Sequence, residues 1–429
     1  MVIEKTKTIL LVLLVASSLL QSYLLAYHSS DFEPIQESDY VETVKIGTQV
    51  SSEHLFYPQQ IVLHKDSETH SVLYPEHIFF DIIYGKIRTA TFEGIRTSSE
   101  FTPLLRERNQ EGGVEIRFGS GIPLSLFNLF IPIKLDFVTQ VDRISTMWLN
   151  VNKTTNQVDI YLVNESETSA YEIITTDISL DHVIEFIGLG ELQANYRVTQ
   201  NQLYIPVEDV PMYSLIYKYT SITTEQMENI LFPDPGITRN LPTRDGTEIY
   251  SDGKRGLQIR TSQLWMSYTD PIAPLEDTSD TREDLNVAVQ FINQRGGWNG
   301  QFRVDYVAPN LTDKGQQIVF RQYLPIYPTA YPIVDQVNQS FGYISTTVQG
   351  GTISEYDRSL IIMEASPTNR SEKSLQGGER LEERLLAYDN LFNVEAVYPA
   401  YQPQITPEYV EFKPVWVVEL DNGVIEVLP

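Results

Sequence analysis

The stretch DTREDLNVAVQFINQRGGWNGQFRVDY, residues 280–306, decides the fold class of this chain. Asp280 and Glu283 form a D-x-x-E helix-start signal. Apolar residues then recur at the spacing of one helix face, at Leu285, Ala288, Val289 and Ile292. Gly296-Gly297 ends the helix, because glycine closes a helix in the left-handed conformation without steric cost. The alternating run FRVDYV that follows predicts a strand.

This helix-to-strand segment opens the second of two similar units. In the first unit we predict a helix at 180–187, strands at 196–207 and 213–220, a helix at 225–231 and a strand pair around Asp252-Gly253. The second unit repeats this order with a period of about 100 residues, through strands within 302–363, a helix at 380–387 and strands within 394–428. Helices that are separated from antiparallel hairpins predict an α+β fold, not a doubly wound sheet.

The region before these units consists of short alternating runs that predict strands. They extend from about residue 44 to residue 165, and two short helices interrupt them around 77–87 and 124–130. We therefore predict three domains after the N-terminal segment, the last two topologically similar. Their bounds are 43–165 (N-terminal), 166–279 (central) and 280–429 (C-terminal).

The N-terminal segment contains an uncharged apolar run, ILLVLLVASSLLQSYLLAY, at residues 9–27. As a helix it would be about 28 Å long, close to the thickness of the hydrocarbon core of a bilayer. Lys5 and Lys7 precede it and acidic residues follow it, so the positive-inside rule keeps residues 1–8 in the cytoplasm and places the bulk of the chain outside. Residues 28–42 are a polar, acidic linker. The alternative is a cleaved signal peptide, but the run exceeds the usual apolar core and lacks a small-residue cleavage site at its end.

One face of this predicted transmembrane helix carries small and polar residues. Ser18, Ser22 and Ala26 lie at i, i+4 and i+8, and Gln21 flanks them. Helices associate in bilayers through close backbone approach and occasional polar contacts, so we predict a partner-helix interface here. The alternative is that small residues are merely tolerated at this depth.

Composition excludes several classes of function. The chain has 429 residues, a net charge of −26 and no cysteine. Such a charge repels nucleic acid and anionic lipid over most of the surface. A large exported protein without disulfides suggests a Gram-positive bacterium.

No motif for catalysis or cofactor binding stands out. None of the six histidines forms a helical pair, so we predict no metal site, and His64, His70 and His77 are expected at scattered surface or loop positions. Ser251-Asp252-Gly253-Lys254 has the S-x-x-K spacing, but Asp252-Gly253 is better interpreted as a hairpin turn. No phosphate-binding loop is present, and we predict neither a cofactor nor an enzyme. A wall-processing enzyme or its substrate-binding module remains the alternative.

Aromatic, glycine and arginine residues gather in the C-terminal half of the sequence. They occur in YSDGKRGLQ (250–258), WMSYTDP (265–271) and FINQRGGWNGQFRVDY (291–306). One interpretation is fold architecture, with glycines in turns and tryptophans in the core; the other is a docking surface, since Trp, Tyr and Arg anchor interfaces. The candidate residues are Tyr250, Asp252, Arg255, Trp265, Gly296, Gly297 and Trp298.

At these residues the sequence resembles the YycH family of membrane-anchored regulators of the WalK (YycG) sensor histidine kinase. The resemblance rests on Y-x-D-G-x-R at 250–255, F-I-N-x-x-G-G-W at 291–298 and P-x-W at 414–416, together with the N-terminal anchor and the acidic, cysteine-free remainder. The family pattern has a histidine before the two glycines, where this sequence has Arg295. The resemblance implies a three-domain extracytoplasmic region, no enzymatic activity, and a membrane complex with the kinase and a YycI-like protein that controls wall metabolism.

Overall fold

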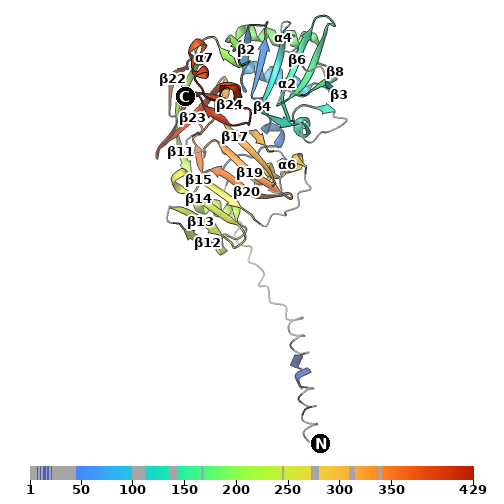
Figure 1. The fold of residues 1–429 in the computed structure, drawn as a ribbon. Coiled ribbons are helices and arrows are strands. Elements are labelled where there is room, and N and C mark those ends of the chain that lie inside the picture. Colours follow the sequence, from blue (N-terminus) through green and yellow to red (C-terminus); the bar gives the residue numbers. More distant parts are fainter. Residues whose placement is uncertain are drawn as a thin grey trace. The chain divides into compact units, whose positions relative to one another are not determined.

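The computed structural model describes residues 7, 10, 13–15, 17–18, 21, 45–98, 112–134, 143–165, 169–243, 246–271, 280–308, 315–336 and 341–429. The chain divides into two units, Met1–Glu42 and Thr43–Pro429 (Figure 1). The described residues of the first unit are helical, and the side chains of Leu10, Leu13 and Leu14 are exposed. Across the described residues, no helix has the length and apolarity needed to cross a bilayer. Most of the predicted transmembrane run, 9–27, lies outside them, so that helix stays a prediction.

The described strands of the second unit form three sheets. The first has ten strands in the order β10-β9-β2-β1-β4-β6-β7-β8-β3-β5, antiparallel except for the pair β3 and β5. Its strands are β1 (Gln60–His64), β2 (His70–Leu73), β3 (Phe92–Ser98), β4 (Gly113–Pro123), β5 (Ile133–Lys134), β6 (Arg143–Asn152), β7 (Gln157–Asn164), β8 (Ala170–Thr176), β9 (Tyr196–Val198) and β10 (Tyr204–Pro206). Helix α4 (Leu180–Leu189) packs on β1, β4, β6 and β7, and α2 (Ile78–Thr89) buries Phe80, Ile83 and Ile87 in the same core.

The second sheet has nine strands, with the main order β12-β13-β14-β15-β20-β19-β17-β16 and β18 paired to β17. Its strands are β12 (Arg239–Pro242), β13 (Thr247–Ser251), β14 (Gly256–Arg260), β15 (Trp265–Thr269), β16 (Gln301–Val307), β17 (Gln316–Ile326), β18 (Thr329–Pro332), β19 (Tyr343–Gln349) and β20 (Thr352–Ser359). Helix α6 (Thr281–Gln294) packs on β17, β19 and β20 (Figure 1). The buried residues of this sheet and of the ten-stranded sheet form one continuous hydrophobic cluster.

The third sheet has six strands and joins distant parts of the sequence. β11 (Val210–Ser221) pairs with β21 (Ile361–Met363), β22 (Asn369–Leu375) and β24 (Tyr409–Leu420), while β24 also pairs with β23 (Val394–Ile405) and β25 (Ile425–Val427). Helix α7 (Gly378–Leu386) packs against β10, and α5 (Thr224–Leu231) follows β11. A small cluster, including Val62, Tyr196, Tyr398 and Val417, fills the contact between this sheet and the ten-stranded sheet.

The structure confirms the mixed helix-and-sheet class with antiparallel sheets, and the five helices predicted from apolar spacing are present. The segment predicted as a short helix around 124–130 is a 3-10 helix, η3 (Leu124–Leu129). Strands from the predicted central domain, 166–279, contribute to all three sheets. The domain bounds 43–165, 166–279 and 280–429, and the topological likeness of the last two, remain predictions.

Candidate functional site

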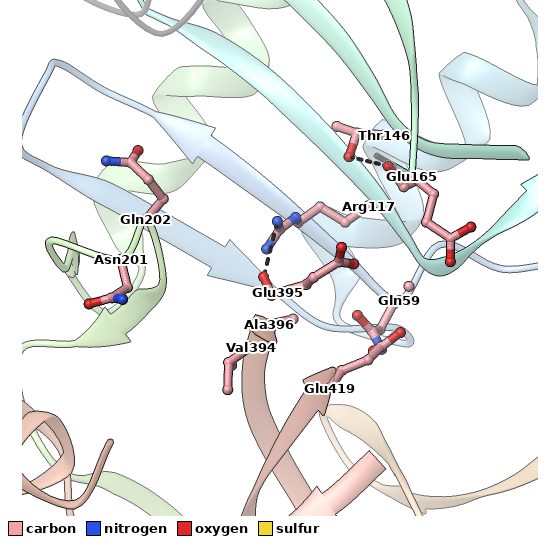
Figure 2. Close-up of a pocket in the computed structure, with 12 residues that line it drawn as sticks. Gln59, Arg117, Thr146, Glu165, Asn201, Gln202, Val394, Glu395, Ala396 and Glu419 are labelled. Carbon is pink, nitrogen blue, oxygen red and sulfur yellow. Dashed lines mark hydrogen bonds between the residues drawn. The ribbon is translucent and has the colours of Figure 1, made fainter. Parts of the chain in front are cut away.

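An acidic cleft of about 270 Å³ lies where the ten-stranded sheet meets the six-stranded sheet (Figure 2). Its described lining comes from β4, β6, β23 and β24 and from nearby loops. The lining residues are Gln59, Arg117, Gly119, Ser145, Thr146, Glu165, Asn201, Gln202, Val394, Glu395, Ala396 and Glu419. Three of them are glutamates and one is an arginine, so the cleft concentrates negative charge between two sheets.

Irregular strand pairing aims these side chains into the cleft. Glu395 is the extra residue where the pairing of β23 with β24 shifts between Val394 and Ala396. A shift of one residue also occurs in β6 between Ile144 and Thr146, and a longer irregularity occurs in β4, where residues 118–121 lie opposite Ser145. A β-bulge turns a side chain out of the regular alternation, which is why bulges are common beside functional sites. Two such bulges and the longer irregularity of β4 border this cleft.

The cleft raises the pKa values of its carboxyl groups. Burial raises the pKa of Glu395 to about 7, with further contributions from the charges of Glu419 and Glu165. Burial also raises the pKa of Glu419, whose carboxylate accepts hydrogen bonds from Gln59 Nε2 at 2.7 Å and from the Tyr398 hydroxyl at 3.2 Å. Carboxylates forced together in a half-buried site cannot all ionise at low cost. With a pKa of about 7, Glu395 exchanges a proton around neutral pH.

Arg117 connects the cleft to a buried polar network in the ten-stranded sheet. Its Nε lies 3.0 Å from Glu115 Oε1, and its Nη2 donates to the backbone oxygen of Glu395 at 3.4 Å. Glu115 also lies 3.2 Å from His64 Nε2 and accepts a hydrogen bond from the Tyr204 hydroxyl at 2.7 Å. Although burial alone would raise the pKa of Glu115, Arg117 and these hydrogen bonds lower it, so the carboxylate stays ionised.

The network also contains the pair His64 and His70, which the sequence analysis wrongly expected at scattered surface positions. Both are buried, and their Nδ1 atoms lie 3.0 Å apart because β1 and β2 pair antiparallel with His64 opposite His70. Burial, and after it the neighbouring charge of His64, lowers the pKa of His70 to about 4. The signal for this contact was the short hairpin between the two histidines, with Asp66 accepting the turn hydrogen bonds from Glu68 and Thr69.

No metal-binding arrangement is found in the part of the chain that the structure describes. There, no group of three or more His, Asp or Glu side chains could hold a metal ion. The cleft holds three carboxyl groups with raised pKa values, those of Glu165, Glu395 and Glu419, and the network beside it holds the ion pair of Arg117 and Glu115.

The F-I-N-x-x-G-G-W motif at 291–298 fastens the segment 46–50 to the rest of the second unit. Trp298 is buried, and its backbone pairs with Thr48 in both directions. The Asn293 side chain exchanges two hydrogen bonds with the backbone of Val50 and accepts a third from Trp298 Nε1 at 2.9 Å. Gly296 and Gly297 have φ of 97° and 85°, and the Gly296 oxygen accepts from two backbone amides of the segment.

The other candidate residues lie around the hairpin of β13 and β14. Asp252 accepts the turn hydrogen bonds from the amides of Lys254 and Arg255, and Arg255 Nε donates to Asp270 at 3.0 Å. The Tyr250 hydroxyl donates to Glu248 at 2.9 Å. The hairpin-turn interpretation of Asp252-Gly253 is thus confirmed, and Ser251 Oγ donates to the Arg255 oxygen within the turn.

The remaining candidates are Trp265 and the membrane-helix residues. Trp265 is buried, with its ring 4.9 Å from that of Tyr343. Ser18 and Gln21 are helical and exposed, whereas Ser22 and Ala26 lie outside the described residues. The candidate docking residues of the second unit thus lie in turns and interior packing, while the acidic cleft is formed by residues that sequence analysis did not single out.

Comparisons with known proteins cover nearly the whole chain. Residues 4–188 match the family model "YycH protein, N-terminal domain", and residues 200–428 match "YycH protein, C-terminal domain". The Bacillus subtilis (strain 168) protein named "Two-component system WalR/WalK regulatory protein YycH" is 22% identical over 99% of this chain and 96% of its own.

One solved structure shares the fold of this chain. The crystal structure of YycH from Bacillus subtilis superimposes with a TM-score of 0.69 at 19% identity, covering 90% of this chain and 99% of that one. An uncharacterized protein from Eubacterium rectale gives a TM-score of 0.33 over 52% of this chain, which is too low to support an argument.

Proposed function

The chain belongs to the YycH family, and from that premise we propose that it is a membrane-anchored regulator of a sensor histidine kinase of the WalK (YycG) type. In this proposal the run 9–27 spans the membrane, the second unit lies outside the cell, and a YycI-like protein takes part in the complex. The protein performs no catalysis, and its effect on wall metabolism passes through the kinase.

The observation that carries the proposal is the extent of the likeness. The matching relative, which is named as a regulatory protein of a two-component system, aligns with almost every residue of this chain. The solved relative shares the fold over nearly its full length. A regulator needs no active site, since it acts by binding one state of its partner more tightly than another, typically by about 1–3 kcal/mol.

The first test is reconstitution. The full chain and its cognate kinase are inserted together into proteoliposomes, and kinase autophosphorylation is measured with and without the YycI-like protein. The proposal expects a change in the rate when the chain is present. An unchanged rate under every combination would refute it.

A second measurement separates the proposal from the enzyme alternative. Purified full chain is incubated with isolated cell wall, and the release of soluble fragments is followed. The proposal expects no release above a buffer control. Steady release that depends on chain concentration would instead support a wall-processing enzyme.

The membrane contact can be tested separately. The double variant Ser18→Leu, Ser22→Leu keeps the segment apolar but removes the small face, so it is expected to reduce co-purification with the kinase. The matched control Leu11→Ile, Leu13→Ile alters other faces and is expected to have little effect. If the Ser18→Leu, Ser22→Leu variant co-purifies with the kinase as well as the parent chain does, the helices do not make contact through the face that carries Ser18 and Ser22.

A further inference from the structure

A second cleft, here called the aromatic cleft, lies where parts of all three sheets meet. It has a volume of about 250 Å³ and contains six tyrosines: Tyr74, Tyr196, Tyr213, Tyr327, Tyr331 and Tyr401. Tyr74 follows β2 of the ten-stranded sheet, Tyr213 lies on β11 of the six-stranded sheet, and Tyr327 lies in the turn from β17 to β18. The cleft is separate from the acidic cleft and shares no lining residue with it.

The aromatic cleft is uncharged although the chain as a whole is strongly acidic. None of its described lining residues is Asp, Glu, Lys or Arg, while the chain carries a net charge of −26. Its one imidazole belongs to His77, whose pKa is lowered by burial, so it is neutral at pH 7. Arg370 lies over the ring of Tyr213 but does not line the cleft, and the lining itself offers a charged ligand no ion pair. A charged ligand would lose hydration on entering, which favours an uncharged ligand.

Two buried hydroxyls of the cleft have no hydrogen-bond partner. They belong to Tyr74, which is 7% exposed, and Tyr401, which is fully buried. The Tyr196 hydroxyl lies near the first and the backbone of Tyr213 near the second, but neither contact has hydrogen-bond geometry. Burial raises the pKa of both phenols, so both keep their protons. Unsatisfied buried hydroxyls are costly, and an acceptor brought in by a ligand would remove that cost once the side chains turn about χ1 toward the cleft.

Three of the tyrosines, Tyr74, Tyr331 and Tyr401, form a continuous row. The ring of Tyr331 lies 5.5 Å from that of Tyr74 and 6.2 Å from that of Tyr401. Tyr327, which also lines the cleft, is 92% exposed. A row of this length matches about one turn of a polyproline helix, which rises about 9 Å in three residues.

We propose that the aromatic cleft binds an uncharged, proline-containing segment of a partner protein in the polyproline conformation. Aromatic-lined grooves recognise such segments because the helix is preformed and loses little entropy on binding. Proline presents a carbonyl acceptor for each tyrosine hydroxyl and has no N–H that the cleft would leave unpaired. A saccharide fits less well, since each of its many hydroxyls needs a polar partner and the cleft offers few.

Direct binding measurements test the proposal without the kinase, so they do not depend on the regulatory function proposed above. Full chain in detergent is titrated into a fluorescein-labelled oligoproline peptide, and fluorescence anisotropy is recorded. Saturable binding is expected for oligoproline and not for a Gly-Ser peptide of equal length. Absence of saturable oligoproline binding, or saturable binding of a chito-oligosaccharide in its place, overturns the proposal.

Three variants locate the binding. Tyr401→Phe and Tyr74→Phe remove only an unpartnered hydroxyl, so each is expected to weaken oligoproline binding about fivefold while the melting temperature is unchanged or higher. Tyr327→Ala removes an exposed ring and is expected to weaken binding without loss of stability. The matched control is Phe392→Ala, since Phe392 is 93% exposed but does not line the cleft. Equal affinity in the parent chain and all three cleft variants overturns the assignment.

Discussion

At the scale of single residues, Glu395 shows how a local irregularity creates a titratable group. Its ordinary pKa of 4.5 is raised to about 7 in the acidic cleft. Between these values the folded chain holds a proton that the unfolded chain has lost, so stability falls as pH rises from about 4.5 to about 7. We predict that Glu395→Gln removes this loss and makes the chain more stable than the parent at pH 8, by about 1–2 kcal/mol after solvent screening. Melting temperatures between pH 5 and pH 8 measure the effect.

The control for this prediction is Glu408→Gln, which changes an exposed carboxylate on the turn before β24. It removes the same charge from the chain and is expected to leave the pH dependence of the parent unchanged. If the melting temperatures of the parent and of Glu395→Gln change with pH in parallel, the prediction is wrong and the carboxyl groups of the cleft ionise independently.

Trp298 is the residue on which the motif at 291–298 depends. It is 1% exposed, and its ring packs 5.0 Å from that of Phe320. Truncation to alanine leaves a cavity, so we predict that Trp298→Ala costs about 3–5 kcal/mol of unfolding free energy. Asn293→Ala should cost less, because water can replace part of its hydrogen bonds to Val50. Urea denaturation of both variants measures which of the two loses more unfolding free energy. A Trp298→Ala chain as stable as the parent would contradict the role of the ring in the core.

At the scale of elements, apolar spacing predicted helices well because a helix is determined by residues close in sequence. The start signal at Asp280 and the glycines after α6 place its ends where the structure has them, within a residue or two. Sheet pairing depends on distant residues and could not be predicted in this way. β11 pairs with β22 and β24, from which it is separated by more than a hundred residues in sequence. The acidic cleft was missed for the same reason, because it arises only where shifted pairings of β4, β6 and β23 come together.

The segment 46–50 provides a prediction at this scale, through a matched pair of glycines. A side chain at Gly47 would overlap the backbone oxygen of Trp298, whereas one at Gly85 in α2 would meet no atom within 4 Å. Gly47→Ala is therefore expected to displace the segment and lower the melting temperature. Gly85→Ala should stabilise the chain by about 0.5–1 kcal/mol and so raise its melting temperature slightly, because alanine favours the helix. Equal melting temperatures for the two variants would mean that the segment is not held by the motif.

At the scale of the whole molecule, the three sheets are linked more closely than a sequence of three domains suggests. The ten- and nine-stranded sheets share one hydrophobic cluster, which runs from Ile46 to Leu360 in sequence. The two family models divide the chain between residues 188 and 200, close to the end of α4. That division puts β10 in the C-terminal range although it completes the ten-stranded sheet, and it leaves β9 between the two ranges, so a boundary in sequence is here not a boundary in packing.

This shared core predicts how the molecule unfolds. Elements that bury the same apolar surface lose it together, so residues 43–429 should unfold in a single cooperative transition in which the calorimetric enthalpy equals the van't Hoff enthalpy. Residues 1–42 form a separate unit, and a chain lacking them is expected to keep this transition at the same temperature. Calorimetry of the full chain in detergent and of the shortened chain makes the comparison. Two or three resolved transitions would instead mean that the predicted segments 43–165, 166–279 and 280–429 fold independently, and that the cluster between the sheets contributes little to holding them together.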